Sequence, residues 1–336
     1  MDFEYLLFLQ NLRIMLNGAL DSAISFITTT AVGFIPLMIL AFVYWNISKK
    51  WGMIAMRSTV FGDVINQLVK LTACIYRPWI LDERIKPVKS ALKAANDYSF
   101  PSGHTSKAMT NYGTYGIGLF KKHKVAGILL LLYVIIIALS RNFLGVHTFK
   151  DVFVGFIIAL ICSVLSIKAE EMLQHNKLKE EVHLLICLII PVVALIYTVV
   201  KPYPMDYVDG KLLVDPKSMT MSAYSIYAAL FTFGICHYID ARFLKYEITK
   251  GKKNTVLSLI LTLPIFLLTI ICYRILLKSL GYITVSIIHD CLAVIYIMLI
   301  VPGVLKFINK KKIEMGATAV TVMNLGLHVL YSLSNK

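Results

Sequence analysis

The chain has 336 residues, of which 58% are hydrophobic and 16% charged, with a mean hydropathy of +0.73. Soluble domains carry about 25% charged residues, so this composition excludes a water-soluble enzyme, and its aromatic content excludes a disordered chain. The apolar residues form continuous runs rather than the short alternating segments of an outer-membrane barrel. We therefore predict an all-α polytopic integral membrane protein built as a helical bundle.

The N-terminal segment, residues 1–23, begins with acidic residues and contains no small-residue cleavage site, which argues against a secretory signal. Tyr5, Phe8 and Leu12 recur at helical spacing, opposite Gln10 and Arg13. This pattern predicts an amphipathic helix that lies on the membrane surface. A tenth transmembrane span is the alternative.

Nine later segments are long and apolar enough to cross a bilayer, which requires about 20 residues each. The apolar stretch at 317–333 is shorter and is not assigned. The nine expected spans lie near residues 24–48, 52–74, 103–120, 125–141, 151–168, 183–200, 221–240, 254–277 and 282–305.

The connections between these spans alternate in basicity, and the positive-inside rule places the basic ones in the cytoplasm. The N-terminus is then outside, the C-terminus is cytoplasmic, and the connections near 74–102 and 142–150 face outward. Much of the formal net charge of +15 therefore comes from the basic cytoplasmic connections and does not indicate a binding partner. The basic clusters begin with Lys49, Lys50 and Arg57 and recur at Lys121, Lys168, Arg242 and Lys306.

The six cysteines lie in or at the end of apolar runs, without the spacing of a metal site or of a disulfide framework. We expect them to be buried thiols. They are Cys74, Cys162, Cys187, Cys236, Cys272 and Cys291.

A polar stripe follows one face of the second span and continues past its end. Asp63, Asn66, Lys70 and Arg77 are spaced so that they share this face. Charged groups within a span are functional candidates because they cost several kcal/mol to bury there. The alternative is that Lys70 extends to the interface and that Arg77 is an ordinary flanking charge.

The run Ser99-Phe100-Pro101-Ser102-Gly103-His104 suits a turn into the start of a helix. The free backbone N–H groups and the dipole at such a start form an anion site. His104 would lie in the first turn of this helix, where a lone histidine is also commonly structural.

A third polar element runs from Ser140-Arg141 through His147 to Asp151. The four-residue spacing permits contact between the imidazole of His147 and the carboxylate of Asp151. A carboxylate bonded to one ring nitrogen leaves the other nitrogen free and more nucleophilic. The alternative is that Asp151 only caps the fifth span.

Under the expected topology all three elements lie at the outer ends of spans, on the same side of the membrane. Three converging cations, Lys70, Arg77 and Arg141, would repel one another unless an oxyanion joined them. Phosphate fits best, because its several oxygens accept charge-assisted and bidentate hydrogen bonds.

Together the three elements resemble the type 2 phosphatidic acid phosphatase superfamily. Its three-part signature is matched without departure over residues 70–151 by Lys70…Arg77-Pro78, Pro101-Ser102-Gly103-His104 and Ser140-Arg141…His147…Asp151.

The resemblance implies a phosphohistidine mechanism without a metal or other cofactor. His147 would be the nucleophile, Asp151 its orienting partner, and His104 the acid and then the base. The phosphate would be held by Lys70, Arg77 and Arg141 and by the backbone N–H groups of Ser102 and Gly103.

The nine-span layout is also similar to that of glucose-6-phosphatase and of the sphingosine-phosphate phosphatases, although the former lacks an acid at the position of Asp151. We expect residues 24–180 to form the phosphatase core and residues 181–336 to add transmembrane helices and a cytoplasmic tail. Asp63 and Asn66 are expected to support the site, with Asp63 paired to Lys70 or Asn66 or serving as a structural charge.

The sequence therefore predicts a phosphatase that hydrolyses a lipid phosphate or diphosphate at the outer membrane interface. Candidate substrates are polyprenyl diphosphate, phosphatidic acid, phosphatidylglycerophosphate and a sphingoid-base phosphate. A sugar-phosphate phosphatase and a lipid phosphotransferase are the enzymatic alternatives. A transporter or scaffold would rest on His289 and Asp290, which as neighbours on a helix point about 100° apart.

Overall fold

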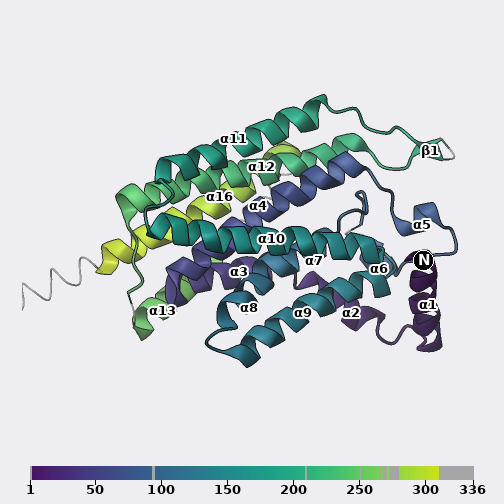
Figure 1. Ribbon diagram of the computed structural model, residues 1–336, viewed down its shortest axis with the longest axis horizontal. Helices are drawn as coiled ribbons and strands as arrows, with labels where there is room; N and C mark the ends of the chain where they lie inside the picture. The colour runs from purple at the N-terminus through teal and green to yellow at the C-terminus, as the bar shows by residue number, and fades with distance from the viewer. Residues whose placement is uncertain are drawn as a thin grey trace, which may run out of the picture.

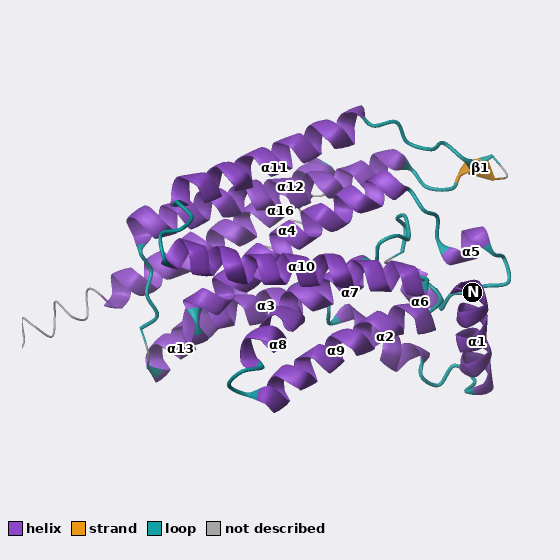
Figure 2. Ribbon diagram, in the orientation of Figure 1, coloured by secondary structure: helices purple, strands orange, loops and turns teal. Residues whose placement is uncertain are grey.

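The computed structural model describes residues 2–92, 95–208, 210–249, 251–264, 267, 271 and 280–309. This part of the chain is mostly helical, and its two short strands, β1 (Tyr207–Val208) and β2 (Lys211–Leu212), pair antiparallel (Figure 2). The helices are α1 (Asp2–Met15), α2 (Asp21–Thr29), α3 (Phe34–Phe42), α4 (Lys49–Ala73), α5 (Pro78–Leu81), α6 (Lys89–Leu92), α7 (Gly103–Ala108), α8 (Thr114–Leu119), α9 (Lys124–Phe143), α10 (Phe149–Gln174), α11 (Glu180–Val200), α12 (Pro216–Ile239), α13 (Lys252–Ile260) and α16 (Tyr282–Ile295).

Helix α4 is central to the bundle, because α7, α10 and α12 all pack against it. It begins after Ser48, whose Oγ accepts a hydrogen bond from the backbone N–H of Trp51. It ends at Cys74, which adopts the left-handed conformation with φ 48°. Most of its side chains are buried, including polar ones such as Asn66 and Lys70. The end of α4 at Cys74 is called the site end below.

Five helices in the described part of the chain are long and apolar enough to cross a membrane. Helices α2 and α3 make a sixth candidate if they form one span, since they meet at a bend of 43°. The five are Lys124–Phe143, Phe149–Gln174, Glu180–Val200, Pro216–Leu244 and Tyr282–Asn309.

The remaining expected spans have different outcomes. The span at 52–74 is α4, whose several charged residues distinguish it from the five. The span at 103–120 is divided into α7, a π-helical turn at Met109–Gly113 and α8. The span at 254–277 is described only in part, and residues 317–333 lie outside the described residues. Nine spans are thus not confirmed.

Helix α1 lies across the site end, nearly at right angles to the long helices (Figure 1). Its buried Arg13 donates to the carbonyl oxygens of Phe143 and Lys86, while Phe8 is 65% exposed. The polar face therefore docks on the connections of the bundle and leaves an apolar face outward. With 14 residues α1 is shorter than the roughly 20 that a span needs.

The largest hydrophobic cluster packs α4 and α12 against the turn that follows α16, around Leu71, Phe233 and Met298. A second cluster packs α9 against the turn after α7, around Met109 and Ile137. The five described cysteines are free thiols, three buried and two half-buried, and Cys272 lies outside the described residues.

Candidate functional site

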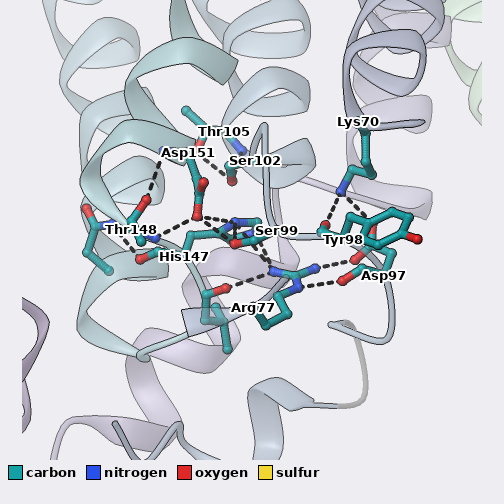
Figure 3. A network of polar contacts seen from close by, with 12 residues as sticks. Lys70, Arg77, Asp97, Tyr98, Ser99, Ser102, Thr105, His147, Thr148 and Asp151 are labelled. Atoms are coloured by element: carbon teal, nitrogen blue, oxygen red, sulfur yellow. Dashed lines mark hydrogen bonds and ion pairs between the residues drawn. The ribbon is translucent and has the colours of Figure 1, made fainter. Parts of the chain in front are cut away.

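The three polar elements of the sequence meet at the site end (Figure 3). Lys70 comes from the last turn of α4, Arg77 from the residue before α5, and His147 from the connection between α9 and α10. A pocket of about 650 Å³ opens there. Lys70, Arg77, Gly103, His104 and His147 are among the residues that line it.

His147 is held between a carboxylate and an arginine. Its Nδ1 lies 3.5 Å from Oδ2 of Asp151, and the Ser99 hydroxyl donates to the same oxygen at 2.6 Å. Arg77 Nη1 lies 2.9 Å from Nε2 of His147. Because a guanidinium only donates, Nε2 is the acceptor and Nδ1 carries the proton. In this tautomer the lone pair of the ring lies on Nε2, where it accepts from Arg77.

Asp151 makes contacts of both kinds considered from the sequence, to the start of α10 and to His147. Its Oδ2 accepts from the backbone N–H of Thr148, which makes it part of a capping box at the start of α10. The same oxygen faces His147 and Ser99. Fixing Asp151 in the first turn of α10 thereby fixes the imidazole.

Asp97 is a part of the site that the sequence analysis missed. Its carboxylate pairs with Lys70 Nζ at 2.5 Å and with Arg77 Nη2, and its backbone oxygen accepts from Arg77 Nε. Lys70 also donates to the carbonyl of Tyr98 at 2.9 Å. Two of the three cations expected to bind phosphate are thus bridged by an acid. No motif marks Asp97, which lies in an irregular segment just before Ser99.

The charges of this site determine the ionisation of Asp97. Burial favours its neutral form, but the positive charges of Lys70 and Arg77 outweigh burial and lower the pKa of Asp97 below its usual range. The carboxylate is 35% exposed, so it reaches the pocket while it is paired.

The pKa of His147 is also lowered, but the causes differ from those at Asp97. Burial, followed by the positive charges of Arg77 and Arg141, lowers the pKa of His147 well below its ordinary value. The imidazole is therefore neutral at physiological pH.

Arg141 is the third predicted cation, and it is 1% exposed. Its Nη1 donates to the Thr28 hydroxyl at 3.2 Å, whereas Nε and Nη2 have no hydrogen-bond partner among the described residues. Buried polar groups are nearly always hydrogen-bonded. Two unpaired donors on a buried guanidinium therefore indicate a place for an anion.

The start of α7 differs in part from the prediction. The backbone N–H of Ser102 donates to the carbonyl of Asp151 at 2.9 Å, so it does not face the pocket, and the predicted phosphate contact is left to Gly103. A side chain at Gly155 would collide with the Ser102 carbonyl, so glycine permits this close approach. The Ser102 hydroxyl instead caps α7 by accepting from Thr105.

Asp63 and Asn66, which were expected to support the site, have different surroundings from each other. Asp63 does not pair with Lys70 or Asn66; its carboxylate lies 3.5 Å from Nζ of Lys107, one turn beyond His104 on α7. Asn66 is buried beside Gly103, and its Nδ2 has no partner.

A second group of titratable residues lies toward the opposite end of α4. Arg57, Glu170, Glu180, His183 and His237 form what is called here the Arg57 cluster. Nitrogen and oxygen atoms of Glu180, His183 and His237 lie within 4.8 Å of one another, as metal ligands would.

The hydrogen bonds of Arg57 disfavour a metal in this cluster. Arg57 Nε donates to Nε2 of His183 at 3.0 Å, and its Nη2 lies 3.2 Å from Nε2 of His237. Because Arg57 can only donate, both rings carry their proton on Nδ1. Nδ1 of His237 lies 3.3 Å from Oε2 of Glu180, and a nitrogen that carries a proton cannot bind a metal. Metal-ligating histidines instead donate their second N–H to an acceptor.

The part of the chain that carries the site is similar to known proteins. Residues 51–174, from α4 to α10, match the family model described as the PAP2 superfamily. The chain is 29% identical to undecaprenyl-diphosphatase BcrC of Bacillus subtilis (strain 168) over 160 residues, which cover 47% of this chain and 79% of that protein.

The chain is also 32% identical to phosphatidylglycerophosphatase B of Bacillus subtilis (strain 168) over 126 residues. That alignment covers 34% of this chain and 55% of the relative, so this chain spans about half of it. No solved structure matches significantly.

Proposed function

We propose, because the chain belongs to the PAP2 superfamily through residues 51–174, that the protein is a membrane phosphatase acting on a lipid phosphate or diphosphate. Two relatives named as phosphatases of lipid substrates support this proposal. They also favour it over the sugar-phosphate alternative. Their two names differ in substrate, so the lipid is left open among the four candidates.

The observation that carries the proposal is the concentration of buried cationic groups around one histidine. Lys70, Arg77 and Arg141 are each at most 3% exposed, and His147 lies beside Arg77. Asp97 is the acid that joins Lys70 to Arg77, while Arg141 keeps two donors unpaired. A phosphate would supply the missing negative charge and the missing acceptors.

In the first step, Nε2 of His147 attacks phosphorus and the bond between phosphorus and the leaving oxygen breaks. The proton on Nδ1 faces Asp151, which stabilises the positive charge that the ring acquires. His104 donates a proton to the leaving oxygen. Lys70, Arg77, Arg141 and the N–H of Gly103 hold the phosphoryl oxygens and stabilise charge in the transition state.

In the second step, His104 takes a proton from water, and the resulting hydroxide attacks the phosphorus of phosphohistidine. The bond between phosphorus and Nε2 breaks, which regenerates neutral His147 and releases inorganic phosphate. The cations do here what Mg²⁺ does in other phosphoryl-transfer enzymes.

The same proposal includes nine transmembrane spans, with the site end on the non-cytoplasmic side and the C-terminus in the cytoplasm. The basic connections support this orientation through the positive-inside rule. Helix α1 would then lie in the outer interface, with its exposed apolar face toward lipid. A headgroup could meet the pocket there without leaving the bilayer.

The experiment is phosphate release by purified protein in detergent, with EDTA present. The panel contains a polyprenyl diphosphate, phosphatidic acid, phosphatidylglycerophosphate, a sphingoid-base phosphate and glucose 6-phosphate. We expect release from at least one lipid, and its loss in His147→Ala. Release only from glucose 6-phosphate, or undiminished release by the variant, would overturn the proposal.

A further inference from the structure

The pocket at the site end adjoins a second cavity and shares three lining residues with it. This inner cavity has a volume of about 500 Å³ and lies between α3, α4, α12 and α16. Lys107, Ser222 and Tyr282 line both spaces and are called the neck. Both volumes fall within the range of small-molecule sites, about 300–1,000 Å³.

A break in the first helix pair runs past the neck. Val32 lines the site pocket and its neighbour Gly33 lines the inner cavity. Gly33 has φ 76° and precedes α3, and a side chain there would meet no atom within 4 Å. Irregular backbone at membrane depth is tolerated where it lines a cavity. The break therefore leaves space beside the neck that a continuous helix would fill.

The lining changes from polar to apolar with distance from the neck. Asp63 faces Lys107 of the neck, and His289 Nδ1 lies 2.9 Å from Asp290 Oδ1. The two side chains meet although their positions on α16 are about 100° apart around the helix. About two turns further from the site end on their helices, the lining residues are apolar, including Met56 and Ile297.

We propose that the inner cavity holds the hydrocarbon chain of the lipid whose phosphate occupies the site pocket. The inference rests on the proposed function. It gives α12 and α16, which lie outside the matched residues 51–174, the task of setting how long a chain is accepted. The polar groups near the neck would face the linkage between phosphate and chain.

Two physical arguments favour this occupant. Protein interiors are densely packed, and an unfilled apolar space costs stability in proportion to its volume. A hydrocarbon chain would restore the missing contacts, whereas a free polar metabolite would leave the apolar end unfilled. Because the two spaces share the lining residues of the neck, one elongated molecule is the occupant that would fill both.

The test uses two adjacent residues of α12. Ala229 lines the inner cavity, whereas Ala228 lines a separate groove between α11, α12 and α16. Ala229→Phe fills the cavity, and Ala228→Phe adds the same side chain on the other side of the helix. Ala293→Phe fills the cavity from α16 and serves if Ala229→Phe does not fold.

Butyl, decyl and hexadecyl phosphates provide one headgroup with three chain lengths. We expect the cavity-filling variants to lose about tenfold in kcat/KM for hexadecyl phosphate, the effect of leaving about two methylenes unburied. Hydrolysis of butyl phosphate and all activities of Ala228→Phe should be unchanged. Equal chain-length preference in the folded cavity variants and the wild type would overturn the inference.

A measurement independent of turnover separates this inference from the proposed function. A hexadecyl phosphate with a diazirine near the end of its chain is cross-linked to wild type and to His147→Ala. We expect labels on α4, α12 and α16 at the inner cavity. Labels at the inner cavity without hydrolysis of any substrate would overturn the proposed phosphatase activity but would support the proposed site for the hydrocarbon chain. Hydrolysis together with labels only on the outward face of α9 would overturn the proposal that the inner cavity holds the chain.

Discussion

Two buried arginines near opposite ends of α4 organise two clusters with nearly the same chemistry. Arg57, within α4, and Arg77, just beyond its end, are each 2% exposed. Each lies against Nε2 of a histidine and forms an ion pair with an acid, Glu170 for Arg57 and Asp97 for Arg77. Residue types alone therefore do not distinguish a site from a structural cluster.

The difference lies in which donors remain unsatisfied and in what the cluster faces. Every nitrogen of Arg57 has a protein partner, and Glu170 is nearly buried. At the site end Arg141 keeps two unpaired donors, and Asp97 is 35% exposed beside a pocket of about 650 Å³. Nδ1 of His183 and of His237 also lack a hydrogen bond within the described part of the chain, so the site end is distinguished by unpaired donors on a buried guanidinium close to an open pocket.

The largest expected difference comes from removing one histidine from each cluster. His147→Ala should lower the rate of phosphate release about 10⁴-fold, because it removes the proposed nucleophile. His183→Ala should change the rate per folded molecule by less than about threefold, since a distant structural residue acts mainly on stability. Initial rates on the preferred lipid, normalised to monodisperse protein, measure both.

The contrast between the two clusters would be wrong if His183→Ala lowered the rate as much as His147→Ala and kept the Tm of the wild type. That result would give the Arg57 cluster a role in the reaction. Loss of folded protein in His183→Ala would leave the comparison intact and would be measured as a lower Tm.

The sequence predicted the site end better than the Arg57 cluster because of where the residues lie in the chain. Lys70, Arg77, His104, His147 and Asp151 are placed by short spacings and by turns into helices, which sequence reports directly. To bring these residues together, the fold needs only to place the connections that carry them on the same side of the membrane.

The Arg57 cluster joins four helices over long sequence separations, from Arg57 to His237, and no local pattern signals it. Sequence analysis assigned Arg57 to a basic cytoplasmic cluster, yet it is buried within the bundle. Asp97 was missed, and the contact between Ser99 and Asp151 was not predicted, for a similar reason. Their partners follow from the path of an irregular segment, which residue spacing does not predict.

The second largest effect is on stability and concerns Arg57. Arg57→Ala should lower the free energy of unfolding by about 3–5 kcal/mol, because Glu170 is left as an unpaired buried charge. Thermal unfolding in detergent measures the change. In the double variant Arg57→Met with Glu170→Leu, much of the loss should be recovered, because apolar side chains of similar size replace the pair. Equal stability of the single and double variants would contradict this explanation.

A smaller effect concerns Asp97, which competes with phosphate for Lys70 and Arg77. Asp97→Asn should lower the concentration of inorganic phosphate needed for half-inhibition about tenfold, because it removes charged hydrogen bonds worth about 1.5–3 kcal/mol each. Asp82→Asn is the matched control, since Asp82 lies in the same connection but pairs with Arg84. Weaker inhibition of Asp97→Asn by phosphate would show that Asp97 supports anion binding instead.

The pH profile should separate the ionisation of His147 from that of His104. His147 must be neutral to attack, and burial with the charge of Arg77 lowers its pKa, so the acid limb should lie below about pH 6.5. The alkaline limb should follow deprotonation of His104, giving a bell. Asp97 raises the pKa of His147, so Asp97→Asn should move the acid limb to lower pH. A rate that stays flat up to about pH 8 would contradict the role of His104, and an acid limb above about pH 6.5 would contradict that of His147.

The smallest expected effect is that of zinc on the Arg57 cluster, and it tests the contrast most directly. Glu180, His183 and His237 are close enough to bind a metal, but Arg57 donates to the nitrogen on each ring that a metal-bound histidine would need as a donor. Added Zn²⁺ should therefore leave the Tm of the wild type unchanged, and EDTA should change neither Tm nor turnover. Arg57→Met frees both rings to donate, so a Zn²⁺-dependent rise in Tm is expected only in that variant. A comparable rise in the wild type would show that the hydrogen bonds of Arg57 do not decide the tautomers.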